Sequence, residues 1–387
     1  MFGTTSVRRC LLLHILSMAG LYFHIPFCKR ICAYFDFFRS ASLHLKEGVV
    51  SAMHDELREE HSFISDRNVR TIYFGGGTPS LLHPAEFQRF IDDADRYFSL
   101  SDVGEITIEA NPDDIDAKYV SELRRTAVNR VSLGVQSFND AELRFMNRRH
   151  SADEAVAAVK RLQDAGIENI TIDLIFGVDG FGEDILRQSL MQALELQVQH
   201  ISAYHLTIEP STTFHRRLCR GEMREVDESR SEAEYALIES VLCGAGFEHY
   251  EVSNYAREGY RSRHNSSYWQ GVQYLGIGPG AHSFNGEQRR WCSQCLEDYV
   301  LRREFQGEQL SQKDKYNELI MTSLRRVEGI SLSEVERRFG EECRKQILGR
   351  ATRWIDAGDL SLDGDSLHIP TSRFLISDAV IESLFEE

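Results

Sequence analysis

Two cysteines stand four residues apart in a short segment that follows an apolar run. The run covers 21–25, and Cys28 and Cys32 come soon after it. Two thiolates on one loop can converge on a soft metal, and iron–sulfur clusters are held by such thiolates. The alternative is that both are small buried apolar side chains, because free cysteine is among the most buried residue types.

Three glycines follow a second apolar run, at 71–74, within the segment Gly75-Gly76-Gly77-Thr78-Pro79-Ser80. Their backbone amides can come close to a carboxylate or phosphate of a ligand. The segment lacks the Lys-Ser/Thr ending of a nucleotide-binding P-loop. It favours a small-ligand site, and a purely structural turn is the alternative.

Charged and amide side chains stand at or beyond the ends of further apolar segments: Glu109, Gln136, Arg148 and Asp173. Burial of such groups without partners is costly. A ligand with hydroxyl and ammonium groups would satisfy them together, whereas each one alone is more often a strand cap or an ion-pair partner.

A histidine lies among aromatic residues in the segment Arg263-His264-Asn265-Ser266-Ser267-Tyr268-Trp269, ahead of a glycine-rich stretch at 276–280. Such a histidine can ligate haem iron while the rings pack on the macrocycle. Three arginines, Arg257, Arg261 and Arg263, could pair with two propionates. A core histidine with satisfied hydrogen bonds is the alternative.

The elements that must position these residues follow from hydrophobic period. Runs rich in β-branched and aromatic residues predict strands at 21–25, 71–74, 105–109, 130–133, 169–176 and 200–206. Segments of helical period separate them, including one that begins at a Ser151 cap and ends at Gly166. This order predicts an α/β fold, a partial (β/α)6 barrel with its chemistry at the C-terminal strand ends.

The pattern changes after about residue 245. Helices are predicted at 316–326 and 341–357, another helix after a capping box at Ser331, and a hairpin at 360–369. They indicate a C-terminal α+β domain with a winged-helix-like tail. Residues 311–387 carry 11 Lys+Arg against 15 Asp+Glu, so we interpret this tail as a packing or partner module and not as a DNA-binding one.

Composition narrows the function classes. The 387 residues carry a net charge of −16, which opposes nucleic-acid binding, and eight cysteines too sparse for a disulfide framework, which favours a reducing cytosol. The apolar stretch 10–16 is too short to span a membrane. We expect an N-terminal extension at 1–17, with a cleaved signal as the alternative, a core at 18–245 and a C-terminal domain at 246–387.

In their order along the chain, these motifs resemble the radical S-adenosylmethionine (SAM) superfamily, and within it the HemW branch of haem chaperones, which are similar to oxygen-independent coproporphyrinogen III oxidases. The resemblance runs from about residue 18 to the C-terminus. It rests on the segments 24–28, 75–80, 108–112, 132–138, 173–177, 207–210, 250–255 and 264–269.

The resemblance implies a [4Fe–4S] cluster on a CxxxCxxC loop, with SAM chelating the fourth iron. Cys28 and Cys32 match the first two metal ligands, and the third position holds Phe35. A phenyl ring cannot ligate iron. We therefore expect an impaired cluster, and radical cleavage of SAM is in question.

The SAM contacts of the family map onto residues of the expected types: Tyr22, Tyr34, Gly76, Gly77, Thr78, Glu109, Gln136, Arg148 and Asp173. The SAM pocket is therefore expected to be retained. Two smaller departures are Asn147, where the family usually has glycine, and Asp179, where it usually has proline.

Two features favour the chaperone branch over the oxidases. The oxidases carry a further cysteine where this chain has Phe37, and the Asp36-Phe37 pair matches the chaperones. The motif that the resemblance associates with haem binding is intact, and its residues are His264, Asn265, Tyr268 and Trp269.

These features together predict a cytoplasmic protein that binds haem and transfers it to an acceptor apoprotein. The expected cofactors are haem, SAM and a doubtful [4Fe–4S] cluster. We expect a monomer or homodimer with no nucleic-acid partner and no transmembrane segment, and transient contact with a membrane surface stays open. The alternatives are an oxygen-independent coproporphyrinogen III oxidase and a catalytically dead scaffold, so whether the chain is an enzyme is left undecided.

Overall fold

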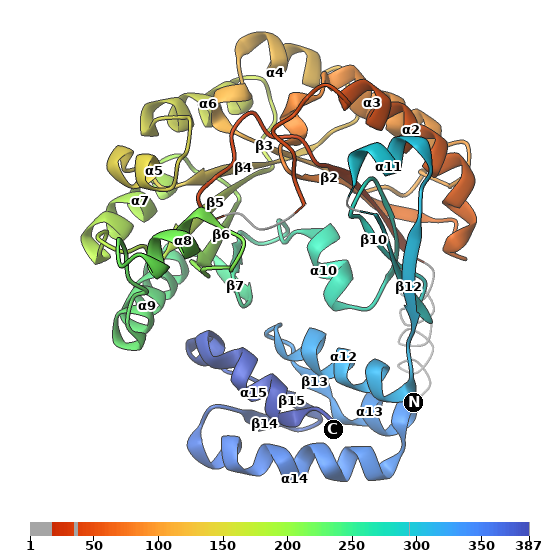
Figure 1. The fold of residues 1–387 in the computed structure, drawn as a ribbon. Helices are drawn as coiled ribbons and strands as arrows, with labels where there is room; N and C mark the ends of the chain where they lie inside the picture. The colour runs from red at the N-terminus through yellow and green to blue at the C-terminus, as the bar shows by residue number, and fades with distance from the viewer. Residues whose placement is uncertain (1–17, 35–37, 294, 387) are drawn as a thin grey trace, which may run out of the picture.

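The computed structural model describes residues 18–34, 38–293 and 295–386 and has the predicted α/β architecture (Figure 1). All six predicted strands are present, and each pairs in parallel with the next along the chain. They are β1 (Ala19–Ile25), β2 (Val69–Gly76), β3 (Glu105–Ala110), β4 (Arg130–Gln136), β5 (Ile170–Phe176) and β6 (His200–His205). The second strand is longer than predicted and includes the first two glycines of the glycine run.

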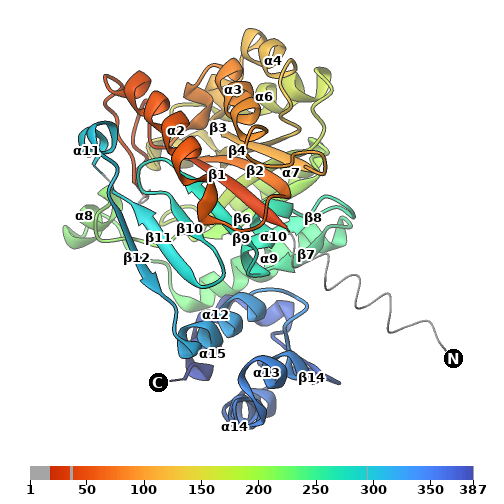
Figure 2. The same ribbon diagram turned by 90° about the vertical axis from the view of Figure 1, so that its right-hand side faces the viewer.

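Helices join successive strands and cover the convex face of this curved sheet (Figures 1 and 2). The helices of this part are α2 (Lys46–Glu60), α3 (Pro84–Ala94), α4 (Ala117–Leu123), α5 (Asp140–Phe145), α6 (Ala152–Asp164), α7 (Glu183–Glu195), α8 (Thr213–Cys219) and α9 (Glu228–Gly244). The predicted cap of α6 is confirmed. Ser151 Oγ accepts from the Glu154 amide, and the Glu154 carboxylate accepts from the Ser151 amide, so two orphan donors are satisfied.

The parallel strands are buried almost throughout, as expected for a sheet covered by helices. Phenylalanines such as Phe23 and Phe74, whose ring centroids lie 4.8 Å apart, fill the core between sheet and helices. Only Tyr22 in β1, Glu109 in β3 and Asp173 in β5 are partly exposed in their strands. In each of β1, β3 and β5, the one residue that is not fully buried is therefore a predicted site position.

Six further strands, which the sequence analysis did not predict, extend the sheet to twelve in the order β12-β11-β10-β9-β1-β2-β3-β4-β5-β6-β8-β7. Strand β9 pairs in parallel with β1, and the remaining additions are antiparallel. Their bounds are β7 (Glu248–Glu251), β8 (Asn254–Ala256), β9 (Gln273–Ile277), β10 (His282–Phe284), β11 (Gln288–Cys292) and β12 (Phe305–Gln309). The same sheet thus spans the division expected at 245/246, which stays a prediction.

Helices and a small sheet form the C-terminal lobe beneath the large sheet (Figure 1). They are α12 (Gln312–Leu324), α13 (Leu332–Phe339), α14 (Glu341–Ala357) and α15 (Ser377–Leu384), with β13 (Ile330–Ser331), β14 (Ser361–Asp363) and β15 (Ser366–His368). The preceding helix, α11 (Leu296–Leu301), lies outside this lobe and packs on α2 (Figure 1). The predicted hairpin is β14–β15. The capping box at Ser331 is only half formed: its hydroxyl accepts from the Glu334 amide, but that carboxylate pairs with Arg338.

One short helix, α10 (Arg263–Trp269), lies on the concave side of the large sheet, between the sheet and the C-terminal helices (Figure 1). It contacts β2 and α12. Among the helices of the described ranges, none is long and apolar enough to cross a membrane.

Candidate functional site

The two cysteines lie on the loop that follows β1, beside the glycine-rich end of β2. Cys28 is buried, and the Thr78 hydroxyl donates to it, with 3.6 Å between Oγ1 and Sγ. Burial raises the pKa of the Cys28 thiol. A Cβ on Gly77 would lie 2.8 Å from the Phe27 carbonyl oxygen. Glycine therefore lets the two loops meet, and the thiols and the glycine run share one site.

Arg148 reaches the second cysteine from the segment after β4. Its Nη1 lies 3.2 Å from Cys32 Sγ, and its Nη2 donates to Asn111 Oδ1 at 2.6 Å and to the Gly134 carbonyl. Its Nε is buried without a partner. A buried cation with an unused donor beside the thiols is suited to a carboxylate ligand.

Two residues near Arg148 have left-handed backbone without being glycine. Gln136 ends β4 with φ 71°, and Asn147 has φ 60°. Such conformations cluster at functional sites, and asparagine tolerates them. Asn147 Nδ2 also donates to the Ile31 carbonyl at 2.8 Å, which ties the Arg148 segment to the cysteine loop. The other family departure, Asp179, accepts from the Arg224 amide at 2.9 Å.

Two carboxylates face the barrel interior. Glu109 accepts from the Tyr73 hydroxyl at 2.7 Å and from the Gly76 amide at 3.0 Å. Asp173 accepts from the Ser132 hydroxyl at 3.2 Å. Burial raises the pKa of Glu109 to about 7 and that of Asp173 to about 6. A cationic ligand would stabilise the ionised form of both carboxylates, because a nearby positive charge favours that form.

The two predicted tyrosines complete this set. Tyr22 OH lies 3.0 Å from His24 Nδ1, and its ring stacks on Tyr73 at 6.1 Å. Tyr34 lies beside Arg148 and Cys32, and burial raises the pKa of its hydroxyl. Carboxylates, a guanidinium and glycine amides at the strand ends are the groups that an amino-acid head group such as that of SAM requires, so the donor set fits SAM.

The residues present do not fit a cluster held by three cysteines. The third position, Phe35, lies outside the described residues together with Asp36 and Phe37. Within the described ranges, no group of three or more histidine, cysteine or acidic side chains is arranged to hold a metal. At this site the described residues provide two thiols, those of Cys28 and Cys32, beside Arg148.

The inner face of β2–β6 and α10 encloses a polar cavity of about 40 Å³, room for a few water molecules. Two buried atoms of its lining have no hydrogen-bond partner, Thr107 Oγ1 and His200 Nδ1. The cavity is lined by Tyr73, Thr107, Glu109, Arg130, Ser132, Thr171, Asp173, His200, Ser202, Tyr204, Ser262 and Asn265.

His264 lies at the opposite end of the barrel from the cysteines. It is 0% exposed, and both ring nitrogens are paired: Nδ1 with Thr71 Oγ1 at 2.8 Å and Nε2 with Tyr268 OH at 2.9 Å. Its ring stacks on Tyr73 at 5.0 Å. Burial lowers the pKa of the imidazole to about 3. In this conformation His264 has the satisfied hydrogen bonds of a core histidine, and neither nitrogen is free for iron.

The other residues of the predicted haem motif are partly buried around this histidine. Asn265 lines the polar cavity, and Tyr268 bonds to His264. The ring of Trp269 lies 5.2 Å from the Arg325 guanidinium, and its Nε1 is buried without a partner. The structure thus places all four residues on α10.

The arginines proposed for the propionates have other partners in this conformation. Arg261 pairs with Glu248 and with Glu328, the latter at 2.7 Å, and Arg257 donates to the Ala245 carbonyl. The guanidinium groups of these two residues are thus paired within the protein, and their pairing with propionates stays a prediction.

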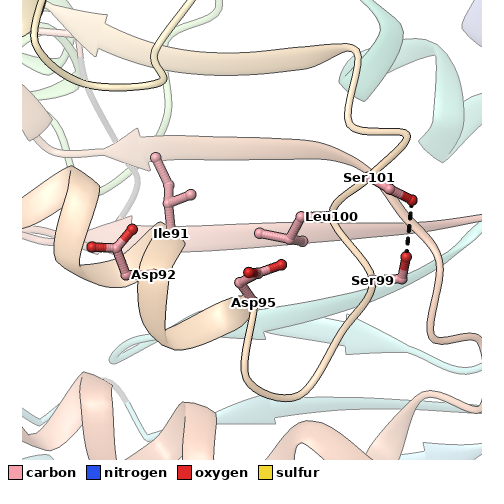
Figure 3. Close-up of a pocket in the computed structure, with 6 residues that line it drawn as sticks. All are labelled: Ile91, Asp92, Asp95, Ser99, Leu100 and Ser101. Atoms are coloured by element: carbon pink, nitrogen blue, oxygen red, sulfur yellow. Dashed lines mark hydrogen bonds between the residues drawn. The ribbon is translucent and has the colours of Figure 1, made fainter.

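A separate surface hollow lies between the end of α3 and the segment 99–101 (Figure 3). Ser99 and Ser101 are hydrogen-bonded at 3.1 Å in it. None of the predicted site residues reaches it, and its lining is Ile91, Asp92, Asp95, Ser99, Leu100 and Ser101.

Several residues important to this arrangement were missed from the sequence. Glu105 and Arg130 begin β3 and β4, are both 2% exposed and pair at 3.3 Å. The Arg130 Nη2 also donates to Thr171 Oγ1 at 2.9 Å. A signal existed: opposite charges begin two neighbouring predicted strands. For Thr71 and Tyr73 no comparable signal existed, since they read as ordinary strand residues.

Known protein families match two parts of the chain. Residues 22–193 match the family described as the radical SAM superfamily, and residues 310–372 match the HemN C-terminal domain. Over nearly all of its length the chain superposes on the solved coproporphyrinogen III oxidase HemN of Escherichia coli, with a TM-score of 0.82 at 20% identity, 99% of this chain and 94% of that one being covered. At this identity the likeness shows the fold.

Curated relatives give a closer match in sequence. The chain is 34% identical to heme chaperone HemW of Lactococcus lactis over 93% of this chain and 96% of that protein. It is 34% identical to heme chaperone HemW of Mycobacterium tuberculosis over 94% of each chain, and 37% identical to that of Escherichia coli over 68% of this chain and 69% of the other. The chain belongs to the HemW family of the radical SAM superfamily.

Proposed function

We propose that this protein is a haem chaperone, which binds haem and passes it to an acceptor apoprotein. The observation that carries this proposal is the match to proteins named heme chaperone HemW over more than nine-tenths of both chains. We assign haem binding to His264, Asn265, Tyr268 and Trp269, where the imidazole would supply a ligand to the iron. We take the acceptor to be a protein, and the net charge of −16 disfavours nucleic-acid partners.

We further assign SAM to the C-terminal ends of the strands, where Glu109, Arg148 and Asp173 offer charges of both signs. Membership of the radical SAM superfamily implies SAM and a [4Fe–4S] cluster. Because Phe35 stands at the third cluster position, the proposed function does not depend on radical cleavage of SAM. We place the protein in the cytoplasm as a monomer or homodimer.

A haemin titration followed at the Soret band tests the haem assignment. We expect the His264→Ala variant to bind haemin about tenfold more weakly or worse, since loss of an iron ligand exceeds 1.4 kcal/mol. His282→Ala is the control, because His282 is exposed on β10 and stacks on Trp291 of β11. Equal affinity of wild type and His264→Ala contradicts the assignment, and loss only in His282→Ala transfers it to that residue.

The enzyme-class alternative, a coproporphyrinogen III oxidase, receives less support. The chain is 34% identical to heme chaperone HemW of Lactococcus lactis, whereas its likeness to coproporphyrinogen III oxidase, at 20% identity, extends to the fold alone. Reconstitution of Phe35→Cys with iron, sulfide, SAM and a reductant, followed by incubation with coproporphyrinogen, separates the two. We expect no decarboxylated product, and its formation would establish the oxidase. A dead scaffold is excluded by detectable binding of either haem or SAM.

A further inference from the structure

Helix α10 is held on the barrel by hydrogen bonds of its first turn and by ring contacts, in which His264 stacks on Tyr73 and Tyr268 meets Tyr274 edge to face. Of its seven residues only His264 is buried, and Arg263 is exposed. None of the α10 side chains belongs to the apolar core of the described residues. The helix therefore buries less apolar surface than the helices whose side chains fill that core.

The buried imidazole is one of two anchors. Its Nδ1 is paired with the Thr71 hydroxyl of β2 at 2.8 Å, and its Nε2 with Tyr268 OH at 2.9 Å. An iron–nitrogen bond needs the lone pair of a ring nitrogen. At least one of these hydrogen bonds must break before His264 can ligate iron.

The second anchor is Glu105 at the start of β3. Its carboxylate accepts from the backbone amides of Arg263 at 3.1 Å and His264 at 2.9 Å. Glu105 is in turn held by Arg130. The first turn of α10 is thus bound to a fixed charge, and release of the helix requires these two bonds to open.

Glycines stand on both sides of the helix. Gly259 has φ +83° and Gly271 has φ +66°, and a Cβ on either would have open space around it. A positive φ favours glycine, and residues of this kind often absorb the backbone rotation at a hinge. These two turns are the points at which the chain would bend as α10 moves.

We propose that α10 is a latch: with His264 bonded to Thr71 the helix is closed, and haem binds after the helix leaves the barrel. Thr71 and Glu105 are positioning residues that act through His264 and keep it from iron. This inference rests on the proposed function, in which His264 is the haem ligand. It adds a closed state in which haem acceptance is gated.

The Thr71→Val variant tests the latch, because valine keeps the shape and removes the hydroxyl. One hydrogen bond lost from the closed state shifts the equilibrium by about 2- to 12-fold. We expect haemin to bind Thr71→Val tighter by that factor. Thr107→Val is the matched control, since Thr107 lies on the neighbouring strand, faces the same interior, and has a buried hydroxyl without a partner. Its haemin affinity should equal that of wild type.

The double variant Thr71→Val/His264→Ala should show no tighter binding than His264→Ala alone, because the gain acts through the imidazole. Unchanged or weaker binding by Thr71→Val, while His264→Ala still binds poorly, overturns the latch and leaves the proposed function standing. Equal binding by wild type and His264→Ala removes the haem assignment itself.

Hydrogen exchange of the unaltered protein gives an independent readout. The amides of Arg263 and His264 are protected by Glu105 in the closed state. On addition of haemin, we expect faster exchange in the peptide 262–270, while a peptide from β5 stays protected. Unchanged or slower exchange in 262–270 overturns the latch.

Discussion

Two glutamates on one strand show how differently the ends of the barrel are built. Glu105 begins β3, is 2% exposed and is paired with Arg130. Glu109, four residues further on, is partly exposed, accepts only from Tyr73 and Gly76, and has no cationic partner in the described part of the chain. The Glu105 carboxylate is paired with a cation of the protein itself, whereas the Glu109 carboxylate can still pair with a cationic ligand. The proposed SAM end is preformed, whereas the proposed haem end is closed on itself.

The largest effect expected at the preformed end concerns iron. Phe35→Cys supplies the third thiolate, which leaves the fourth iron of a [4Fe–4S] cluster for SAM. We expect stable cluster in the restored protein and none in the chain as it stands, measured anaerobically as iron and sulfide content with electron paramagnetic resonance. Phe37→Cys is the control, since the same thiol is two residues out of register. Equal cluster content in Phe35→Cys and the unaltered chain would show that another group replaces the missing thiolate.

The closed end is expected to depend on its buried ion pair. Arg130→Met leaves Glu105 charged and unpaired, and breaking a buried pair destabilises a protein by about 3–5 kcal/mol. Chemical denaturation should show this loss. Arg58→Met is the matched control, because Arg58 is 57% exposed and its pair with Asp55 contributes at most about 1 kcal/mol. Similar losses of stability in Arg130→Met and Arg58→Met would show that the buried ion pair contributes no more than an exposed one.

The uneven success of the sequence analysis follows from the same contrast. Buried parallel strands read as continuous apolar runs, so β1–β6 and the residues at their C-terminal ends could be predicted. Strands such as β12 are almost wholly exposed and polar, and they show no alternation that would predict them. Burial of His264 was equally hidden, because it depends on Thr71, which lies 193 residues away in the sequence. Contacts between residues far apart in the sequence depend on the fold, whereas the ends of strands can be recognised from the neighbouring sequence.

The pH dependence of stability separates the ligand carboxylate from a structural one. Burial raises the pKa of both Glu109 and Glu56 from 4.5 to about 7, and Glu56 is held by the Gly278 amide and Tyr299. A raised carboxyl pKa means that the native state holds the proton more tightly than the unfolded chain. Ionisation of each of the two carboxyl groups therefore lowers the free energy of unfolding, by about 3 kcal/mol per group, as the pH rises from about 4.5 to 7.

Glutamine at either position should remove that part of the pH dependence, as measured by denaturation between pH 4.5 and 8. Only Glu109→Gln should also abolish binding of labelled SAM in equilibrium dialysis, because only Glu109 lies at the strand ends among the proposed SAM contacts. Loss of SAM binding in Glu56→Gln would contradict this distinction between the two carboxylates.

The smallest expected effect concerns Tyr73, which touches both ends: its hydroxyl donates to Glu109 and its ring stacks on His264. Tyr73→Phe keeps the ring and removes the donor. Because this hydrogen bond lowers the pKa of Glu109, its loss should move the pH at which SAM binding develops to a higher value and weaken SAM binding several-fold at pH 7. Haemin affinity should be unchanged, since the stacking surface remains. A parallel change in haemin affinity would show that the two ends act as one coupled site. Binding of SAM and binding of haem would then affect each other reciprocally, and the two ends could not be described as independent.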